Sequence, residues 1–155
     1  IGGHSAGGNI ATTVCRMLRD QGRYPFLAQV LNCPPLDFFT PAAEKYFAEG
    51  AVPPEDAEIF DACYRPEGMD AKDIRISPLW QSPKELTGMP DALVISAEHD
   101  SLREEAEAYA EKLMQAGCEV TGKRFPGRRH AFAASEADGQ DYMIAYLKRK
   151  LFGEE

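Results

Sequence analysis

The chain has 155 residues, of which 44% are hydrophobic and 27% are charged, enough apolar material for the core of one globular domain. A formal net charge of −8 and the lack of a basic stripe argue against a nucleic-acid-binding protein. No run approaches the roughly 18 apolar residues of a membrane helix, and no signal peptide is visible. The four cysteines are scattered without a C-x-x-C pair, which favours buried thiols in a reducing compartment and hence a cytoplasmic protein.

Glycines surround a serine at the start of the chain. Gly3-His4-Ser5-Ala6-Gly7 fits G-x-S-x-G, a strand-to-helix turn that lifts a serine hydroxyl towards a substrate. Glycine is needed two residues before and after the serine, because larger side chains would collide with the adjoining strand and helix. The N–H of Ala6 would then be free to point at a developing oxyanion. The alternative is a glycine-rich turn with an incidental serine, and only the downstream sequence separates the two.

The position of this motif in the chain is unusual. No initiator Met is present, and only Ile1 and Gly2 precede the motif. A serine turn of this kind should follow a buried strand, which would be cut away almost entirely here. We therefore expect the chain to be the C-terminal part of a longer protein.

Strand-like and helix-like segments alternate after the serine. A helix packed on a sheet is predicted first, with an apolar stripe of Ile10, Val14, Met17 and Leu18. Residues 27–31 then indicate a buried parallel strand ended by Pro34-Pro35. Asp37, just after this strand, is either a site residue or a turn residue.

Residues 38–82 interrupt the alternation. Thr40-Pro41 and Pro53-Pro54 each predict the start of a short helix. The segment holds seven of the fifteen aromatic residues, namely Phe38, Phe39, Tyr46, Phe47, Phe60, Tyr64 and Trp80. This density favours a cap that lines an apolar pocket. The alternative is that the aromatic residues only attach the insertion to the body of the protein.

The second half returns to strands and helices. Residues 92–97 are the clearest strand of the chain and lead into Glu98-His99-Asp100. Ser101 to Glu104 fit a capping box that begins a helix ended by Gly117. The inner face of this helix is predicted to be Ala106, Tyr109, Ala110 and Leu113.

The last part of the chain predicts one more strand and one more helix. Residues 119–125 form a charged strand, typical of a sheet edge, and Pro126-Gly127 is expected to turn the chain towards His130. The final helix, over roughly residues 135–151, is predicted to present Met143, Ile144, Leu147 and Leu151 to the core.

Three polar residues follow three predicted strands of this α/β arrangement. The carboxyl ends of parallel strands share one edge of the sheet, so Ser5, Asp100 and His130 should lie together. Their order along the chain, Ser, Asp, His, is that of the α/β-hydrolases. Glu98 is the rival acid on the same strand, but Asp100 lies at the strand end. His130 is the one histidine after the acid; the alternative is a loop histidine that stacks on Phe132.

Four segments together resemble the α/β-hydrolases of the hormone-sensitive-lipase-like esterase group, also called fold-3. They are Gly3-His4-Ser5-Ala6-Gly7-Gly8-Asn9, Ile76-Ser77-Pro78-Leu79, Glu98-His99-Asp100-Ser101-Leu102-Arg103-Glu104-Glu105 and His130-Ala131-Phe132. The resemblance implies the C-terminal part of a parallel α/β sheet flanked by helices. Residues 1–155 would form a single partial domain, with residues 38–82 as a helical cap insertion. The group often carries Asp at the position of His4, and it has a His-Gly-Gly-rich oxyanion loop upstream that these residues do not include.

The expected chemistry is that of a serine carboxylic-ester hydrolase acting on small esters through an acyl-enzyme. Ser5 would be the nucleophile, His130 the general base and then acid, and Asp100 the residue that orients the imidazole. Ala6 N–H would supply one oxyanion donor, within the elbow that Gly3, His4 and Gly7 complete. No metal or organic cofactor is implied.

The same three residues also fit other functions. A sugar deacetylase, an amidase or a peptidase would use the same triad. A further alternative is a binding fragment without catalytic activity. Without the upstream oxyanion loop, the 155-residue piece alone should be weak or inactive. Its bared apolar sheet edge also predicts a homo-oligomer.

Overall fold

The computed structural model describes residues 1–130 and 132–153. Four parallel strands form one sheet in the order β1-β2-β3-β4. Their bounds are β1 (Gly2–His4), β2 (Ala28–Asn32), β3 (Asp91–His99) and β4 (Val120–Arg129). The register aligns the carboxyl ends of neighbouring strands, for example His4 with Asn32 and Asn32 with Ile95. The parallel α/β fold predicted from the sequence is confirmed.

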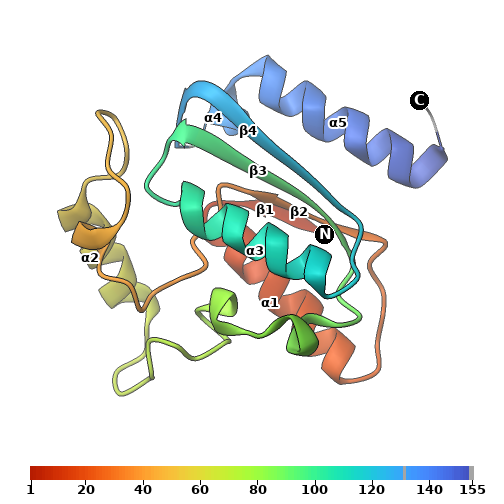
Figure 1. Cartoon of the computed structure of the whole chain (residues 1–155), viewed down its shortest axis with the longest axis horizontal. Helices are drawn as coiled ribbons and strands as arrows, with labels where there is room; N and C mark the ends of the chain where they lie inside the picture. The colour runs from red at the N-terminus through yellow and green to blue at the C-terminus, as the bar shows by residue number, and fades with distance from the viewer. Residues whose placement is uncertain (131, 154–155) are drawn as a thin grey trace.

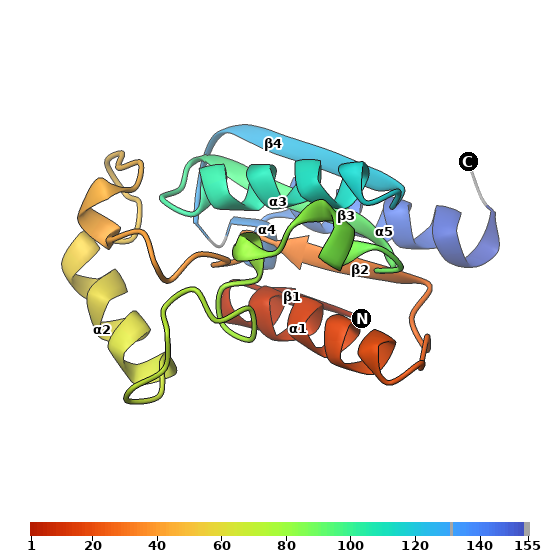
Figure 2. The ribbon, with the colours of Figure 1, turned by 60° about the horizontal axis from the view of Figure 1, so that its bottom comes forward.

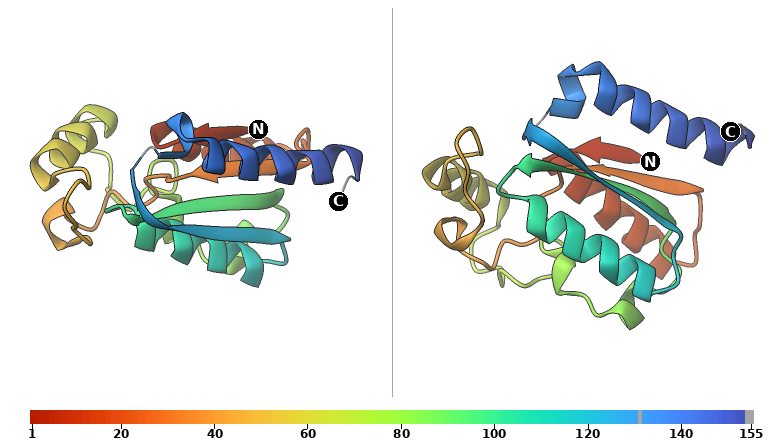
Figure 3. Two further views of the ribbon diagram at one scale, coloured as in Figure 1. Left: turned by 90° about the horizontal axis from the view of Figure 1, so that it is seen from above. Right: turned by 45° about the horizontal axis from the view of Figure 1, so that its top comes forward.

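Helices cover both faces of the sheet (Figure 1). The right-hand view of Figure 3 shows α1 and α3 on one side of the strands and α5 on the other. The helices are α1 (Ala6–Asp20), α2 (Pro54–Tyr64), α3 (Arg103–Gln115), α4 (Phe132–Ser135) and α5 (Ala137–Phe152). Three short 3₁₀ turns complete the set, η1 (Ala42–Glu44), η2 (Pro78–Trp80) and η3 (Pro83–Leu86).

The core has two layers because successive strand residues point to opposite faces of the sheet. On β3, Ala92 and Val94 belong to the cluster shared with α1 and α3, whereas Leu93 and Ile95 belong to the cluster shared with α5. The predicted inner face of α3 is confirmed: Ala106, Tyr109, Ala110 and Leu113 are all buried. Gly117, with a φ of 91°, follows the end of that helix as expected.

The apolar stripe predicted for α1 is wrong in part, since Val14 and Leu18 are half-buried but the other two residues are not. Ile10 and Met17 are exposed, and α1 instead buries a face of small and polar residues, Gly8, Asn9, Ala11, Thr12 and Cys15. Small residues let α1 approach the strands closely: a Cβ on Gly8 would lie 2.9 Å from Cβ of Pro34. This close contact requires small residues on the buried face of α1. The periodicity of large apolar residues in the sequence does not indicate such a contact.

The inner face predicted for α5 is also wrong in part. Ile144, Leu147 and Leu151 are exposed, while Gly139 and Tyr146 are buried. Gly139 is a close-contact position, because a Cβ there would lie 2.4 Å from Cβ of Ala133. Gly139 thus packs against α4, whereas Tyr146 belongs to the core cluster beneath the sheet and Met143 is partly buried against that cluster.

Two local predictions around β3 and β4 need correction. The capping box at Ser101–Glu104 does not form: Leu102 is the N-cap residue of α3, and its N–H is taken up by Oδ1 of Asp100 at 3.1 Å. Pro126-Gly127 does not end β4, which continues to Arg129. The strand pairing shifts register between Ala97 and His99, and Gly127 accommodates this irregularity with a φ of 67°.

Residues 38–82 lie mostly beyond the carboxyl ends of the strands (Figure 2). Pro54 begins α2 as predicted, but Thr40-Pro41 leads only into the 3₁₀ turn η1, with Pro41 as its N-cap residue. The aromatic residues largely pair with one another: Phe38 with Tyr64 at 5.2 Å between ring centroids, and Phe39 with Trp80 at 5.0 Å. Asp37 is a turn residue, accepting hydrogen bonds from Phe39, Thr40 and Trp80.

Candidate active site

Ser5 lies in the tight turn that joins β1 to α1. Its φ and ψ are 51° and −124°, and its N–H donates to the carbonyl of Asn32 at 2.8 Å. A Cβ on Gly3 would lie 2.1 Å from the carbonyl carbon of Gly7, so glycine is required at position 3. Gly7 differs from the expectation, because a Cβ there meets nothing within 4 Å among the described residues. The turn is therefore built on Gly3 and on the close contact of Gly8 with Pro34.

The three residues predicted to form a catalytic triad lie side by side. Nε2 of His130 is 3.0 Å from Oγ of Ser5, and Nδ1 of His130 is 2.9 Å from Oδ2 of Asp100. Ser5 follows β1, Asp100 follows β3 and His130 follows β4, so the parallel register brings them to one edge. This chain of hydrogen bonds is what a serine needs to pass its proton to an imidazole that a carboxylate orients.

Burial differs along this chain of groups. The Asp100 side chain has 0% exposure, and its second oxygen accepts from Leu102 N–H, so the carboxylate is fixed in position. The His130 side chain is 16% exposed, so solvent reaches the imidazole but not the carboxylate. Glu98, the rival acid, is placed elsewhere: its Oε2 accepts from Gly127 N–H at 2.6 Å and so ties β3 to β4.

His4 lies against the imidazole of His130. The two ring centroids are 5.1 Å apart at an interplanar angle of 47°. Burial and the neighbouring His130 lower the pKa of His4 below its usual value, while Asp100 opposes this. Nε2 of His4 is buried without a hydrogen-bond partner in the described part of the chain. His4 therefore packs against His130 as a neutral ring.

Asn9 is a structural residue of the site whose role the sequence did not reveal. It is fully buried on the first turn of α1 and donates to the carbonyls of Pro35 and Ile76 at 2.8 and 2.6 Å. Its Oδ1 accepts from the hydroxyl of Tyr64 at 3.0 Å. Asn9 thus joins the serine helix, the loop after β2 and the insertion, through contacts between residues far apart in the sequence.

A buried ion pair joins α3 to the insertion near the site. Glu105 of α3 is within 2.7 Å of Lys45 Nζ, and its Oε1 accepts from Leu36 N–H at 2.6 Å. Burial raises the pKa of Glu105 to about 7, although Lys45 and the Leu36 N–H act in the opposite direction. Lys45 also donates to the carbonyl of Asp37 at 2.6 Å. The pair connects α3 to the segment that follows η1.

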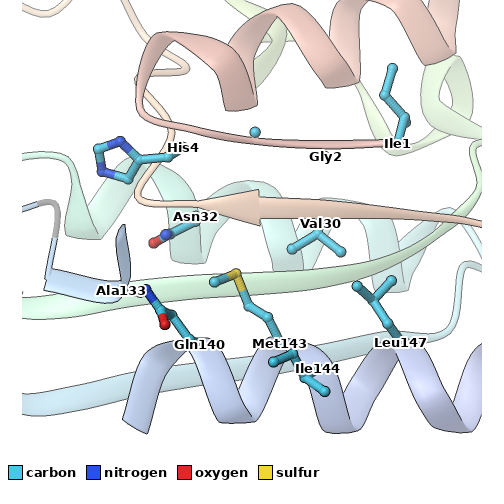
Figure 4. A pocket seen from close by; sticks show the side chains of 11 residues that line it. Ile1, Gly2, His4, Val30, Asn32, Ala133, Gln140, Met143, Ile144 and Leu147 are labelled. Carbon is cyan, nitrogen blue, oxygen red and sulfur yellow. The ribbon is translucent and has the colours of Figure 1, made fainter. Parts of the chain in front are cut away.

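An apolar cavity opens on the other face of the sheet (Figure 4). Ile1, just before β1, and Val30 of β2 line one side, and Met143 and Leu147 of α5 line the other. His4 lies at one end of the cavity and Ser5 is not among its lining residues. The cavity is therefore a gap in the packing between sheet and helix beside the triad, and not its substrate pocket.

The family model described as alpha/beta hydrolase fold matches residues 1–134. The chain belongs to the α/β-hydrolase fold family. The match confirms the resemblance to hormone-sensitive-lipase-like esterases that the sequence motifs predicted.

Sequence and structure comparisons find relatives within this family. Carboxylesterase NlhH of Mycobacterium tuberculosis is 34% identical over 97% of this chain and 50% of its own length. An arylesterase of Saccharolobus solfataricus is 32% identical, again over 97% and 50%. A solved esterase structure from Rhizomucor miehei superposes with a TM-score of 0.86 at 34% identity, over 96% of this chain and 49% of its own. The chain thus spans about half the length of the relatives it matches.

No helix in the described ranges 1–130 and 132–153 combines the length and apolar character needed to cross a membrane.

Proposed function

We propose that the protein carrying this chain is a serine carboxylic-ester hydrolase that acts on small esters. The observation that carries the proposal is the Ser5–His130–Asp100 chain of hydrogen bonds, with distances of 3.0 and 2.9 Å. The printed names of the relatives, a carboxylesterase and an arylesterase, support an ester as the bond that is cleaved.

The reaction proceeds in two halves. Ser5 Oγ attacks the ester carbonyl carbon while its proton passes to Nε2 of His130, and Asp100 stabilises the imidazolium that forms. His130 then gives this proton to the departing alcohol, which leaves Ser5 acylated. Water, deprotonated by His130, attacks the acyl carbon and releases the carboxylic acid.

Ala6 supports the developing oxyanion. It is the first residue of α1, so its N–H is one of the four that have no partner within the helix. The positive end of the helix dipole lies at the same place. The family resemblance implies further donors in an upstream loop. Loss of one such donor typically costs roughly 10²–10³ in turnover. The 155-residue chain by itself is therefore weak or inactive.

We assign residues 38–82 to a cap over this site, within the single partial domain 1–155. Its position beyond the carboxyl ends of the strands and its link to α1 through Tyr64 and Asn9 support the assignment. We also propose that the protein is cytoplasmic, because its cysteines are scattered without a C-x-x-C pair. We further propose that it forms a homo-oligomer, because an apolar edge of its sheet is bare.

Hydrolysis of p-nitrophenyl acetate by the whole protein tests the function. We expect Ser5→Ala to lower kcat by about 10⁴-fold or more, since the triad acts as a unit. Ser82→Ala, which changes an exposed serine at the start of η3, is the matched control and should keep the native rate. Absence of hydrolysis by the folded native protein, or full activity of Ser5→Ala, would contradict the proposal.

A further inference from the structure

Cys33 occupies a strained position at the carboxyl end of β2. Its φ is 47°, and in the described chain Ser5 is the other non-glycine residue with a positive φ. Such a conformation is unfavourable for a residue with a side chain and persists only where the surroundings enforce it. Cys33 N–H donates to the carbonyl of Ile95 at 2.9 Å, while the adjacent Asn32 carbonyl holds Ser5 N–H. The fold therefore fixes a cysteine, 1% exposed, beside the serine turn.

The Cys33 side chain lies next to two members of the triad. One ligand atom each from Cys33, Asp100 and His130 falls within 4.8 Å of the others. A thiolate, a carboxylate oxygen and an imidazole nitrogen are the ligand types that zinc takes in proteins. With Zn–S near 2.3 Å and Zn–N near 2.0 Å, tetrahedral coordination places sulfur and nitrogen about 3.5 Å apart, so the cluster needs to close by no more than roughly 1.3 Å.

We propose that Cys33, Asp100 and His130 form an inhibitory binding site for Zn²⁺, which Cd²⁺ also occupies. The inhibitory effect rests on the proposed esterase function, whereas binding of the metal does not. The ion is an inhibitor that competes with catalysis, not a cofactor.

The charges of the site balance when the ion binds. The Cys33 thiol releases one proton to solvent and its sulfur bonds to the metal, Asp100 contributes a carboxylate, and His130 contributes the lone pair of a neutral imidazole. Two negative ligands then face a doubly charged cation, and no electron is transferred. Access is through His130, whose side chain is 16% exposed.

Either imidazole nitrogen gives inhibition when it binds the metal. Coordination by Nε2 removes the atom that accepts the proton of Ser5. Coordination by Nδ1 leaves the remaining ring proton on Nε2, which then faces Ser5 as a donor and cannot act as a base. In both cases His130 Nε2 can no longer accept the proton of Ser5 through the hydrogen bond of 3.0 Å that joins it to Ser5 Oγ.

A Cd²⁺ titration of the whole protein tests the binding site directly. The ultraviolet absorption of cadmium–thiolate bonds reports binding without any need for activity. We expect one such site in the native protein, its loss in Cys33→Ser, and its retention in Cys63→Ser, which changes an exposed cysteine on α2. His130→Ala provides a second variant that leaves the cysteine in place, and it should weaken Cd²⁺ binding about tenfold or more. An absorption change that stays the same in Cys33→Ser, or in His130→Ala, would overturn the site.

Inhibition by Zn²⁺ is the second arm. We expect half-inhibition of p-nitrophenyl acetate hydrolysis at a Zn²⁺ concentration at least about tenfold lower in the native protein than in Cys33→Ser. Each variant is compared with its own rate in a chelator, so a change in basal rate does not matter. Equal inhibition of the two proteins would refute the inhibitory role of Cys33. Absence of any hydrolysis would instead count against the esterase function, and the Cd²⁺ titration would still decide the metal site.

Discussion

At the residue scale, the serine turn depends on the absence of one side chain. The Cβ of an alanine at position 3 would lie 2.1 Å from the carbonyl carbon of Gly7, well inside van der Waals contact. At position 7 the same added carbon meets nothing within 4 Å. The two glycines of G-x-S-x-G therefore have unequal roles in this chain, although the motif treats them alike.

We predict that Gly3→Ala lowers the free energy of unfolding by at least ~1–3 kcal/mol, the usual cost of overpacking. Gly7→Ala is the matched control and should be neutral or stabilising by up to ~1 kcal/mol, because Gly7 lies within α1. Urea unfolding of the two variants measures this difference. Equal destabilisation by both substitutions would show that the contact at Gly3 is not the constraint.

The triad residues could be predicted from the sequence because each has a local cue. Ser5 lies in a motif, and Asp100 and His130 follow recognisable strands in the family's order. Cys33 lies in no motif, and the motif that contains Asn9 does not indicate its role, because both roles depend on contacts with Asp100, Ile76 and other residues far along the chain. Sequence patterns show where polar groups follow strands, but not which buried groups those residues then contact.

At the scale of elements, β2, β3, β4 and the parallel sheet could be predicted, whereas the short strand β1 and the buried faces of α1 and α5 could not. Both helices make a close contact through a glycine: Gly8 of α1 with Pro34 and with the Gly3 carbonyl of β1, and Gly139 of α5 with Ala133 of α4. Hydrophobic periodicity scores large side chains, so it selected Ile10 and Ile144, which are exposed. The capping box failed for a related reason: Asp100 takes the Leu102 N–H and shifts the start of α3.

The ion pair of Lys45 with Glu105 is the contact between elements that responds to pH. Burial raises the Glu105 pKa from 4.5 to about 7, against Lys45, with the nearby Asp37 carboxylate adding to the increase. Between these two values the folded chain binds more protons than the unfolded chain. The stability that Glu105 contributes is thus complete below pH 4.5 and is lost as the pH rises through about 7.

We predict that native stability, relative to that of Glu105→Gln, falls by ~2 kcal/mol between pH 5 and pH 8, because glutamine does not titrate. Urea unfolding at several pH values measures this difference. Glu111→Gln, on the exposed face of the same helix, is the control for the general effect of removing a carboxylate from α3. A constant difference between native protein and Glu105→Gln across this range would mean that Glu105 does not titrate there.

At the scale of the whole molecule, this chain leaves apolar surface without a partner. Ile10 and Met17 are exposed on α1, and Ile144 and Leu147 are exposed on α5 beside the cavity next to β1. Strand β1 is also an edge strand, which presents unpaired backbone groups along one side. The chain covers about half the length of its relatives, 50% of the carboxylesterase NlhH.

We predict that the isolated 155-residue chain self-associates. Two copies would pair along their β1 edges, or make contact through the apolar cavity that β1, β2 and α5 line. Static light scattering at tens of micromolar measures the mass, and Ile144→Glu should shift the population towards monomer. A clean monomer of the unsubstituted chain at that concentration would contradict this prediction.

The central claim is that Ser5 is a nucleophile activated by His130, and fluorophosphonate labelling of the whole protein tests it most directly. Intact mass spectrometry counts covalent adducts on the native protein and on Ser5→Ala and His130→Ala. The account predicts one label per native chain, none on Ser5→Ala, and strongly slowed labelling of His130→Ala. A folded native protein that takes no label, or a Ser5→Ala protein that is labelled at the native rate, would contradict it.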